Sequence, residues 1–153
     1  MRESIHRFKY RRERARGDYL GSLLAESLRQ GLGTEGVTTD LVVPLPLHPR
    51  RERERGFNQA AVLATPVARV LGVPVLAALE RTTETRSQVG LGFEARRRNV
   101  RQAFRCVAHD LNGLHVLLID DVVTTGATFE AAARALLGAG AARVDGLALA
   151  REI

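Results

Sequence analysis

Residues Val116–Thr128 read VLLIDDVVTTGAT, and they carry the strongest indication of the fold in this sequence. Its first four residues, Val116–Ile119, are apolar strand formers, as expected for a strand buried on both faces of a parallel sheet. Two acids follow, Asp120 and Asp121, and then a turn of small residues, Thr124–Thr128. After the turn, the apolar spacing predicts a helix that places four side chains on one face: Phe129, Ala132, Ala133 and Leu136.

The turn has the composition of a phosphate-binding loop. A turn that leads into a helix N-terminus directs several backbone N–H groups at one point, where the helix dipole favours an anion. Threonine hydroxyls add donors, and Gly126 lets an anion approach the backbone closely. We therefore assign phosphate binding to five consecutive residues: Thr124, Thr125, Gly126, Ala127 and Thr128.

The two acids beside this loop need a ligand group that lies between their charges and the phosphate. Sugar hydroxyls donate to carboxylates, and Mg²⁺ can bridge carboxylates to phosphate oxygens, often through water. A ribose phosphate satisfies both requirements, so we expect Asp120 and Asp121 to act on the ribose and to hold Mg²⁺. Adjacent strand residues point to opposite faces, and we favour Asp121 if only one of them contacts the sugar. The alternative is a strand end and a helix cap that bind no ligand.

The whole string is similar to the phosphoribosyl-pyrophosphate (PRPP) motif of the type I phosphoribosyltransferases. Further segments resemble the ComF-like competence proteins within that family: VPLPL at Val43–Leu47, RGFNQA at Arg55–Ala60, and Gln88, Arg96, Asn99 and Phe104. The resemblance runs from Phe8 to Arg151. It implies a three-layer α/β fold with a mostly parallel sheet flanked by helices. It also implies PRPP or ribose 5-phosphate as ligand, Mg²⁺ as cofactor, and transfer to an acceptor that the sequence does not identify.

The same resemblance assigns further site residues. Pro46 and Arg55 are expected at the ligand, and Gln88 and Arg96 lie in a segment, residues 81–101, that corresponds to a mobile loop closing over the reacting centre. His48–Arg55 corresponds to the pyrophosphate loop and holds four arginines. A solvated charged turn is the alternative for each of these arginines, and we favour Arg55 because it stands in the hexapeptide.

Length and residue usage limit the remaining possibilities. The 153 residues are expected to form one domain, residues 17–153, after a basic N-terminal arm, residues 1–16. Many ComF-like proteins carry a four-cysteine zinc module ahead of this domain, but this sequence has one cysteine, Cys106, and four histidines at unrelated spacings. We therefore expect no zinc site. No apolar run approaches a membrane span, which favours a cytoplasmic protein.

The net charge of +6 comes almost entirely from arginine. Guanidinium groups match phosphate oxygens in pairs, so the composition suits phosphate or nucleic-acid partners. An arginine preference also arises from genome composition alone, so the charge does not decide the function.

Other segments predict the surrounding elements. Strands are expected at residues 41–43, 73–76 and 143–149. A helix should begin at Asp18, with one face formed by Leu20, Leu23, Leu24, Ser27 and Leu28. A second helix should run from Asn58 to Gly72, with a kink or break at Pro66.

Two further functions remain open at this stage. ComF-like proteins are associated with DNA uptake in natural transformation, which suggests a module that handles single-stranded DNA together with the uptake machinery. Aromatic residues make up only 5% of the chain, which weakens this alternative because single-strand grooves use aromatic stacking. A PRPP sensor without turnover is the other alternative, and a homodimer is compatible with either.

Overall fold

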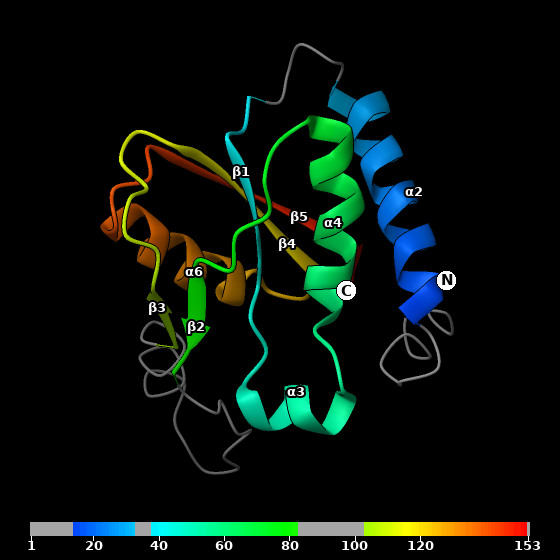
Figure 1. Cartoon of the computed structure of the whole chain (residues 1–153), viewed down its shortest axis with the longest axis horizontal. Helices are drawn as coiled ribbons and strands as arrows, with labels where there is room; N and C mark the ends of the chain where they lie inside the picture. Colours follow the sequence, from blue (N-terminus) through cyan, green and yellow to red (C-terminus); the bar gives the residue numbers. More distant parts are fainter. Residues whose placement is uncertain (1–13, 33–37, 83–102, 153) are drawn as a thin grey trace.

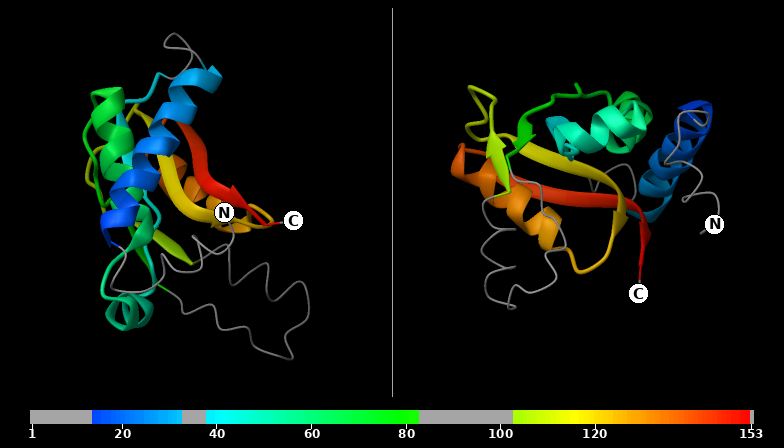
Figure 2. Two further views of the ribbon diagram at one scale, coloured as in Figure 1. Left: turned by 90° about the vertical axis from the view of Figure 1, so that its right-hand side faces the viewer. Right: turned by 90° about the horizontal axis from the view of Figure 1, so that it is seen from below.

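The computed structural model describes residues 14–32, 38–82 and 103–152 (Figure 1). The elements follow in this order: α2 (Arg14–Leu32), β1 (Leu41–Pro44), α3 (Pro49–Arg55), α4 (Gln59–Leu71), β2 (Leu79–Arg81), β3 (Phe104–Cys106), β4 (His115–Val123), α6 (Ala127–Gly138) and β5 (Arg143–Arg151). Helices lie on both faces of the main sheet (Figure 2). The predicted three-layer α/β fold with a mostly parallel sheet is confirmed.

The main sheet has the strand order β1–β4–β5, and all three strands are parallel. β4 is central, and β5 pairs with it from His115 to Val123. The predicted strand at residues 73–76 is reduced to a single parallel bridge between Val75 and Val42. Pro74 has no N–H group to donate, which limits how far this segment can extend the ladder.

β4 is buried on both faces, as its continuous apolar run predicts. Val116, Leu117, Leu118 and Ile119 are each at most 3% exposed. Val116 and Leu118 belong to a core shared with α6 and the β2–β3 pair, while Leu117 and Ile119 belong to a core shared with α2 and α4. Successive side chains of β4 point to opposite faces of the sheet, so the strand contributes to two separate apolar layers.

α4 forms as predicted, with Asn58 as its N-cap and Gly72 as its left-handed C-cap. The predicted break at Pro66 is wrong, because the helix runs unbroken through this residue. Pro66 is buried where α2 crosses α4, and a Cβ at Gly21 would lie only 2.8 Å from the Pro66 ring. Gly21 therefore lets the two helices approach closely at the proline.

α2 differs from its prediction in two ways. It begins at Arg14, so Asp18 lies inside the helix and is not its cap. Arginine and alanine are good helix formers, and they extend the helix beyond the first cap-like residue. Leu24 and Leu28 are buried as predicted, but Leu23 is 45% exposed, because the contact with α4 at Gly21 turns a different side of the helix inward. No helix in the described ranges has the length and apolar content of a membrane span.

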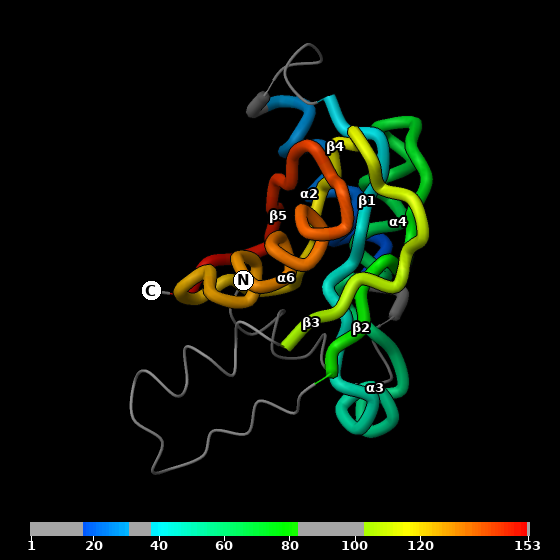
Figure 3. Tube along the Cα trace, turned by 90° about the vertical axis from the view of Figure 1, so that its left-hand side faces the viewer, coloured from blue at the N-terminus to red at the C-terminus, as the bar shows by residue number. Residues whose placement is uncertain are grey.

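A second, antiparallel sheet pairs β2 with β3. This pair was not predicted, because strands of three residues carry little periodicity. Leu79 and Phe104 are buried, and the Arg81 guanidinium lies over the Phe104 ring at 5.4 Å. Figure 3 shows the two strands side by side, at the same end of the molecule as α3.

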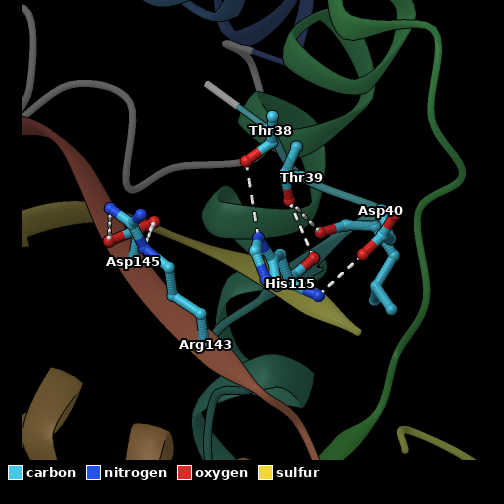
Figure 4. A network of polar contacts seen from close by, with 7 residues as sticks. Thr38, Thr39, Asp40, His115, Arg143 and Asp145 are labelled. Atoms are coloured by element: carbon cyan, nitrogen blue, oxygen red, sulfur yellow. Dashed lines mark hydrogen bonds and ion pairs between the residues drawn. The ribbon is translucent and has the colours of Figure 1, made fainter. Parts of the chain in front are cut away.

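The amino ends of β1 and β4 are joined by a polar network (Figure 4). The backbone N–H of His115 donates to Asp40 Oδ2 at 2.7 Å, and the Asp40 N–H donates to the His115 carbonyl at 2.8 Å. The Thr39 hydroxyl donates to the same His115 carbonyl at 3.0 Å. These side chains satisfy the backbone groups that the sheet leaves at this end.

Candidate functional site

The turn after β4 is shaped by Gly126, which has φ +80 and serves as the N-cap of α6. A Cβ at this position would meet nothing within 4 Å, so the need for glycine comes from the left-handed backbone and not from packing. α3 and α4 begin with the side-chain caps His48 and Asn58, whereas the N-cap of α6 makes no side-chain hydrogen bond. Apart from the Ala127 N–H, which contacts the Thr125 hydroxyl, the first-turn N–H groups of α6 meet no side-chain cap and are left for another acceptor.

The hydroxyls of this turn lie at the surface. Thr124 and Thr125 are exposed, and Thr128 is partly buried in the first turn of α6. The Ala127 N–H donates to Thr125 Oγ1 at 3.4 Å, a long contact that a stronger acceptor could replace. Residues 124–128 therefore combine backbone and hydroxyl donors within one short stretch.

Asp120 lies one step beyond the buried part of β4, on the same face as Val116 and Leu118. One of its carboxylate oxygens accepts the Asp121 N–H at 2.8 Å. Burial and then the neighbouring negative charge of Asp121 raise the pKa of Asp120 to about 7, while the positive charge of Arg81 opposes the rise. A free carboxylate is thus disfavoured here until a cation or hydrogen-bond donor arrives.

Arg81 interacts with this acid, and Arg51 lies close enough to Arg81 to act on its charge. Burial lowers the pKa of Arg81, the positive charge of Arg51 lowers it further, and Asp120 acts in the opposite direction. Arg81 lies on β2 and Arg51 on α3, so β2 brings a positive charge to Asp120 on β4 and α3 brings a second positive charge to Arg81. Two guanidinium groups that repel one another form an environment that favours an anion.

A cavity of about 480 Å³ adjoins this cluster through Arg81. It lies between the exit of β1, the start of α4 and β2. Its lining consists of Pro44, Pro46, Leu47, Pro49, Glu52, Asn58, Ala61, Ala77, Leu79, Glu80 and Arg81. Pro46, predicted at the ligand, thus lies on the same cavity as Arg81.

The hexapeptide RGFNQA forms the junction between α3 and α4. The segment before it was expected to be a loop or a charged turn, but it forms α3, capped by His48 and ended by Gly56 at φ +82. Asn58 caps α4 and also donates to the Leu45 carbonyl at 3.0 Å, which ties the junction to β1. These hexapeptide residues thus have structural roles.

Arg55, the last residue of α3, is positioned by Gln59. Its Nη1 donates to Gln59 Oε1 at 3.3 Å, and Gln59 is only 1% exposed. Among the described residues, Gln59 Nε2 has no hydrogen-bond partner. The buried Gln59 amide therefore accepts a hydrogen bond that orients Arg55, a role that the sequence did not indicate.

The predicted site residues thus fall into three groups. Asp120, Asp121 and residues 124–128 lie close together in sequence at the carboxyl end of β4, while Pro46 precedes α3 and Arg55 is its last residue. Gln88 and Arg96 lie outside the described residues. Arg51 was expected only as one of the four arginines of the pyrophosphate segment, and Arg81 only as the first residue of the loop segment; neither was singled out for the site. Within the described ranges, no three acidic, histidine or cysteine side chains gather as a metal site.

Comparison with solved structures identifies the same fold. The chain aligns with the B. subtilis glutamine PRPP amidotransferase with a TM-score of 0.58, at 22% identity over 87% of this chain and 26% of that one. It aligns with the Pyrococcus horikoshii purine phosphoribosyltransferase with a TM-score of 0.53, at 19% identity over 88% and 73% of the two chains.

Curated relatives share more of the sequence. DNA utilization protein YhgH of Escherichia coli O157:H7 is 36% identical over 97% of this chain and 66% of its own length. Competence protein F of Haemophilus influenzae is 31% identical over 96% and 66%. Competence protein ComFC of Bacillus subtilis is 32% identical over 99% and 60%. The chain thus spans slightly less than two thirds of the length of these relatives.

The phosphoribosyl transferase domain matches residues 58–152, from the N-cap of α4 to the end of β5. This range includes β4, the turn and α6, although it begins after α3. The chain therefore belongs to the phosphoribosyl transferase domain family, and its relatives include competence and DNA utilization proteins.

Proposed function

We propose that this chain binds PRPP or ribose 5-phosphate at the carboxyl end of β4 and acts as a phosphoribosyltransferase. The observation that carries the proposal is the direct succession of an acid with a raised pKa, a hydroxyl-rich turn and a helix that begins at a left-handed glycine. One ribose phosphate could interact with all three parts, its hydroxyls with the acid and its phosphate with the turn and the helix N-terminus.

The phosphate would bind at residues 124–128. The first-turn N–H groups of α6 and the Thr125 hydroxyl supply donors, and the helix dipole adds a favourable field. The ribose hydroxyls would then donate to the acids that precede the turn. A donated hydrogen bond favours the carboxylate form, so binding would return Asp120 to its ionised state.

The pyrophosphate would lie toward Arg51 and Arg81. The two guanidinium groups repel one another, and a pyrophosphate between them would relieve this repulsion. Arg55, held by Gln59, would add a further donor from the end of α3.

Mg²⁺ fits the chemistry of this donor set. Two adjacent carboxylates, one with a raised pKa, favour a cation, and Mg²⁺ prefers oxygen ligands and usually keeps several waters. Asp120 and Asp121 would hold the ion together with oxygens of the ligand. When bound, Mg²⁺ would neutralise charge on the leaving pyrophosphate.

Catalysis by the protein would be electrostatic. Loss of pyrophosphate leaves positive charge on the anomeric carbon, and carboxylates aimed at the sugar stabilise that charge as it develops.

We further propose that this activity serves DNA uptake or DNA use. The support is the naming of relatives that are 31–36% identical over nearly all of the chain. The net charge of +6 is compatible with a nucleic-acid partner nearby.

The test is a thermal melt with PRPP and Mg²⁺. At a ligand concentration a hundredfold above the dissociation constant, binding should add about 2.7 kcal/mol to the free energy of unfolding and raise Tm. Thr125→Val should lose most of this rise, whereas Thr65→Val on the exposed side of α4 should keep it. No change in Tm for the wild type at millimolar PRPP would refute the binding site.

Turnover is measured separately, as release of pyrophosphate from PRPP in the presence of candidate acceptors. Binding without any release under all acceptors would leave a PRPP-binding protein and refute the transferase part of the proposal.

A further inference from the structure

β5 is the edge of the main sheet. Within the described part of the chain it pairs with β4 alone, over its full length, and its sequence, RVDGLALAR, contains no proline. Long edge strands are usually shortened, interrupted or covered, because their free N–H and C=O groups pair with other chains. Among the residues that the structure describes, no further strand pairs with the free edge of β5, and the strand runs without interruption for nine residues.

The hydrogen bonds at the two ends of β5 show which of its residues direct their backbone N–H and C=O groups toward β4. The Ala142 N–H donates to the Leu114 carbonyl and the Glu152 N–H to the Val123 carbonyl, each at 2.9 Å. Even-numbered residues thus direct their N–H and C=O groups toward β4, and the odd-numbered residues from 143 to 151 direct theirs to the free edge.

The same odd-numbered residues share one face of the sheet. Gly146, an even-numbered residue, lies against the Phe129 ring of α6. Leu147 and Leu149 instead pack against the core on the other face, with α2 and α4. The charged residues Asp145 and Arg151 belong to this second face and are exposed, and Asp145 forms an exposed ion pair at 2.9 Å with Arg143 of the same strand.

A two-fold axis at Ala148 makes this edge complementary to itself. Antiparallel pairing about that point places Asp145 of one copy opposite Arg151 of the other, twice, and Leu147 opposite Leu149, twice. If the two-fold axis passed through Leu147, Arg143 of one copy would lie opposite Arg151 of the other, a pair of like charges. If it passed through Leu149, Leu147 would lie opposite Arg151, an apolar residue against a charge. Opposite charges and apolar pairs across strands are favourable, and like charges are not, so the centre at Ala148 is preferred.

α2 adds an apolar flank beside the same edge. Its Gly21 contacts α4, and at 3.6 residues per turn Tyr19 and Leu23 lie on the side turned away from α4. Both are unusually exposed for apolar residues, at 65% and 45%. Since α4 packs over β1 and β4 while α2 packs over β5, this side of α2 borders the β5 edge (Figure 2).

We propose that two copies of this chain associate through β5, antiparallel about Ala148, to form one continuous sheet. Tyr19 and Leu23 of the two α2 helices flank the joined strands on one face. Such an interface is isologous, so the same residues act on both sides. It leaves the turn after β4 in each copy available to a ligand.

Sedimentation equilibrium across a dilution series tests the proposal through charge reversal. Wild type should form dimers. Asp145→Arg alone, and Arg151→Asp alone, should each raise the dissociation constant about tenfold or more, because each places two like-charged pairs in the interface. Asp145→Arg combined with Arg151→Asp should restore the wild-type constant.

The matched control is Glu130→Arg, which reverses an exposed acid of the Glu130–Arg134 pair on α6 and should leave the dissociation constant unchanged. A wild-type protein that is monomeric at every concentration would overturn the proposal. The β5 edge would then be open to pairing with a strand of another protein. A dimer that both single reversals leave intact, or that the double reversal does not restore, would overturn the β5 interface.

Discussion

The two ends of the main sheet both carry polar side chains, but they use them differently. At the amino end, Asp40 and Thr39 accept from or donate to backbone groups of His115, and the network is closed within the chain (Figure 4). At the carboxyl end, Asp120 has a raised pKa, two arginines repel one another, and α6 begins without a side-chain cap. Polar groups that satisfy each other stabilise the fold, whereas groups held in unfavourable surroundings indicate a ligand.

The largest expected effect comes from Asp120→Asn at the carboxyl end. The ordinary pKa of 3.8 is raised to about 7 in the folded protein, so the folded state binds more protons than the unfolded chain between about pH 4 and 7. The free energy of unfolding should therefore fall as the pH rises through this window. The variant removes this loss and should be more stable than wild type at pH 8, by on the order of 2–4 kcal/mol.

Urea unfolding without ligand or added metal, measured at pH 4, 6 and 8, checks this prediction. The gap between variant and wild type should close toward pH 4. A variant that follows the wild type at every pH would show that the surroundings of Asp120 do not oppose its charge.

Removing an acid at the amino end should have the opposite sign. Asp40→Ala leaves the His115 N–H without its 2.7 Å acceptor and should lower the free energy of unfolding by about 0.5–1.5 kcal/mol. The same urea experiment at pH 7 measures it. If Asp40→Ala and Asp120→Asn shift stability in the same direction, the contrast between the two ends fails.

The smallest stability change is expected for Gln59→Met at the α3–α4 junction. Methionine has a similar volume and removes a buried Nε2 that has no partner among the described residues, so the change in unfolding free energy should stay within about 1 kcal/mol. Arg55 loses its hydrogen bond, and PRPP affinity should fall several-fold. Gln59→Glu is the control, because it keeps an acceptor for Arg55. Equal affinities for all three proteins would show that Arg55 does not need this positioning.

Sequence reasoning succeeded where the information is local. The apolar run of β4 and the caps Asn58 and Gly72 each depend on neighbouring residues, and all were confirmed. Asp18 failed as a cap because arginine and alanine before it continue the helix, a competition between local signals of similar strength.

The approach of Arg81 to Asp120 could not be predicted, because these residues are far apart in sequence and depend on the pairing of β2 with β3. The role of Gln59 was also hidden, because burial of a polar side chain is set by how α3 and α4 meet. Sequence patterns therefore locate the turn and its acids, while the charges that face them come from tertiary packing.

We expect the turn after β4 to hold a phosphate while the acids before it recognise a sugar. Calorimetric titration of ribose 5-phosphate and of inorganic phosphate into wild type, Asp120→Asn with Asp121→Asn, and Thr125→Val tests it directly. The acid variant should weaken ribose 5-phosphate by about tenfold or more, since hydrogen bonds to charged groups are worth about 1.5–3 kcal/mol, and should leave inorganic phosphate almost unchanged. Thr125→Val should weaken both ligands. Equal weakening of both ligands by the acid variant, or no binding of either ligand to wild type, would contradict the account.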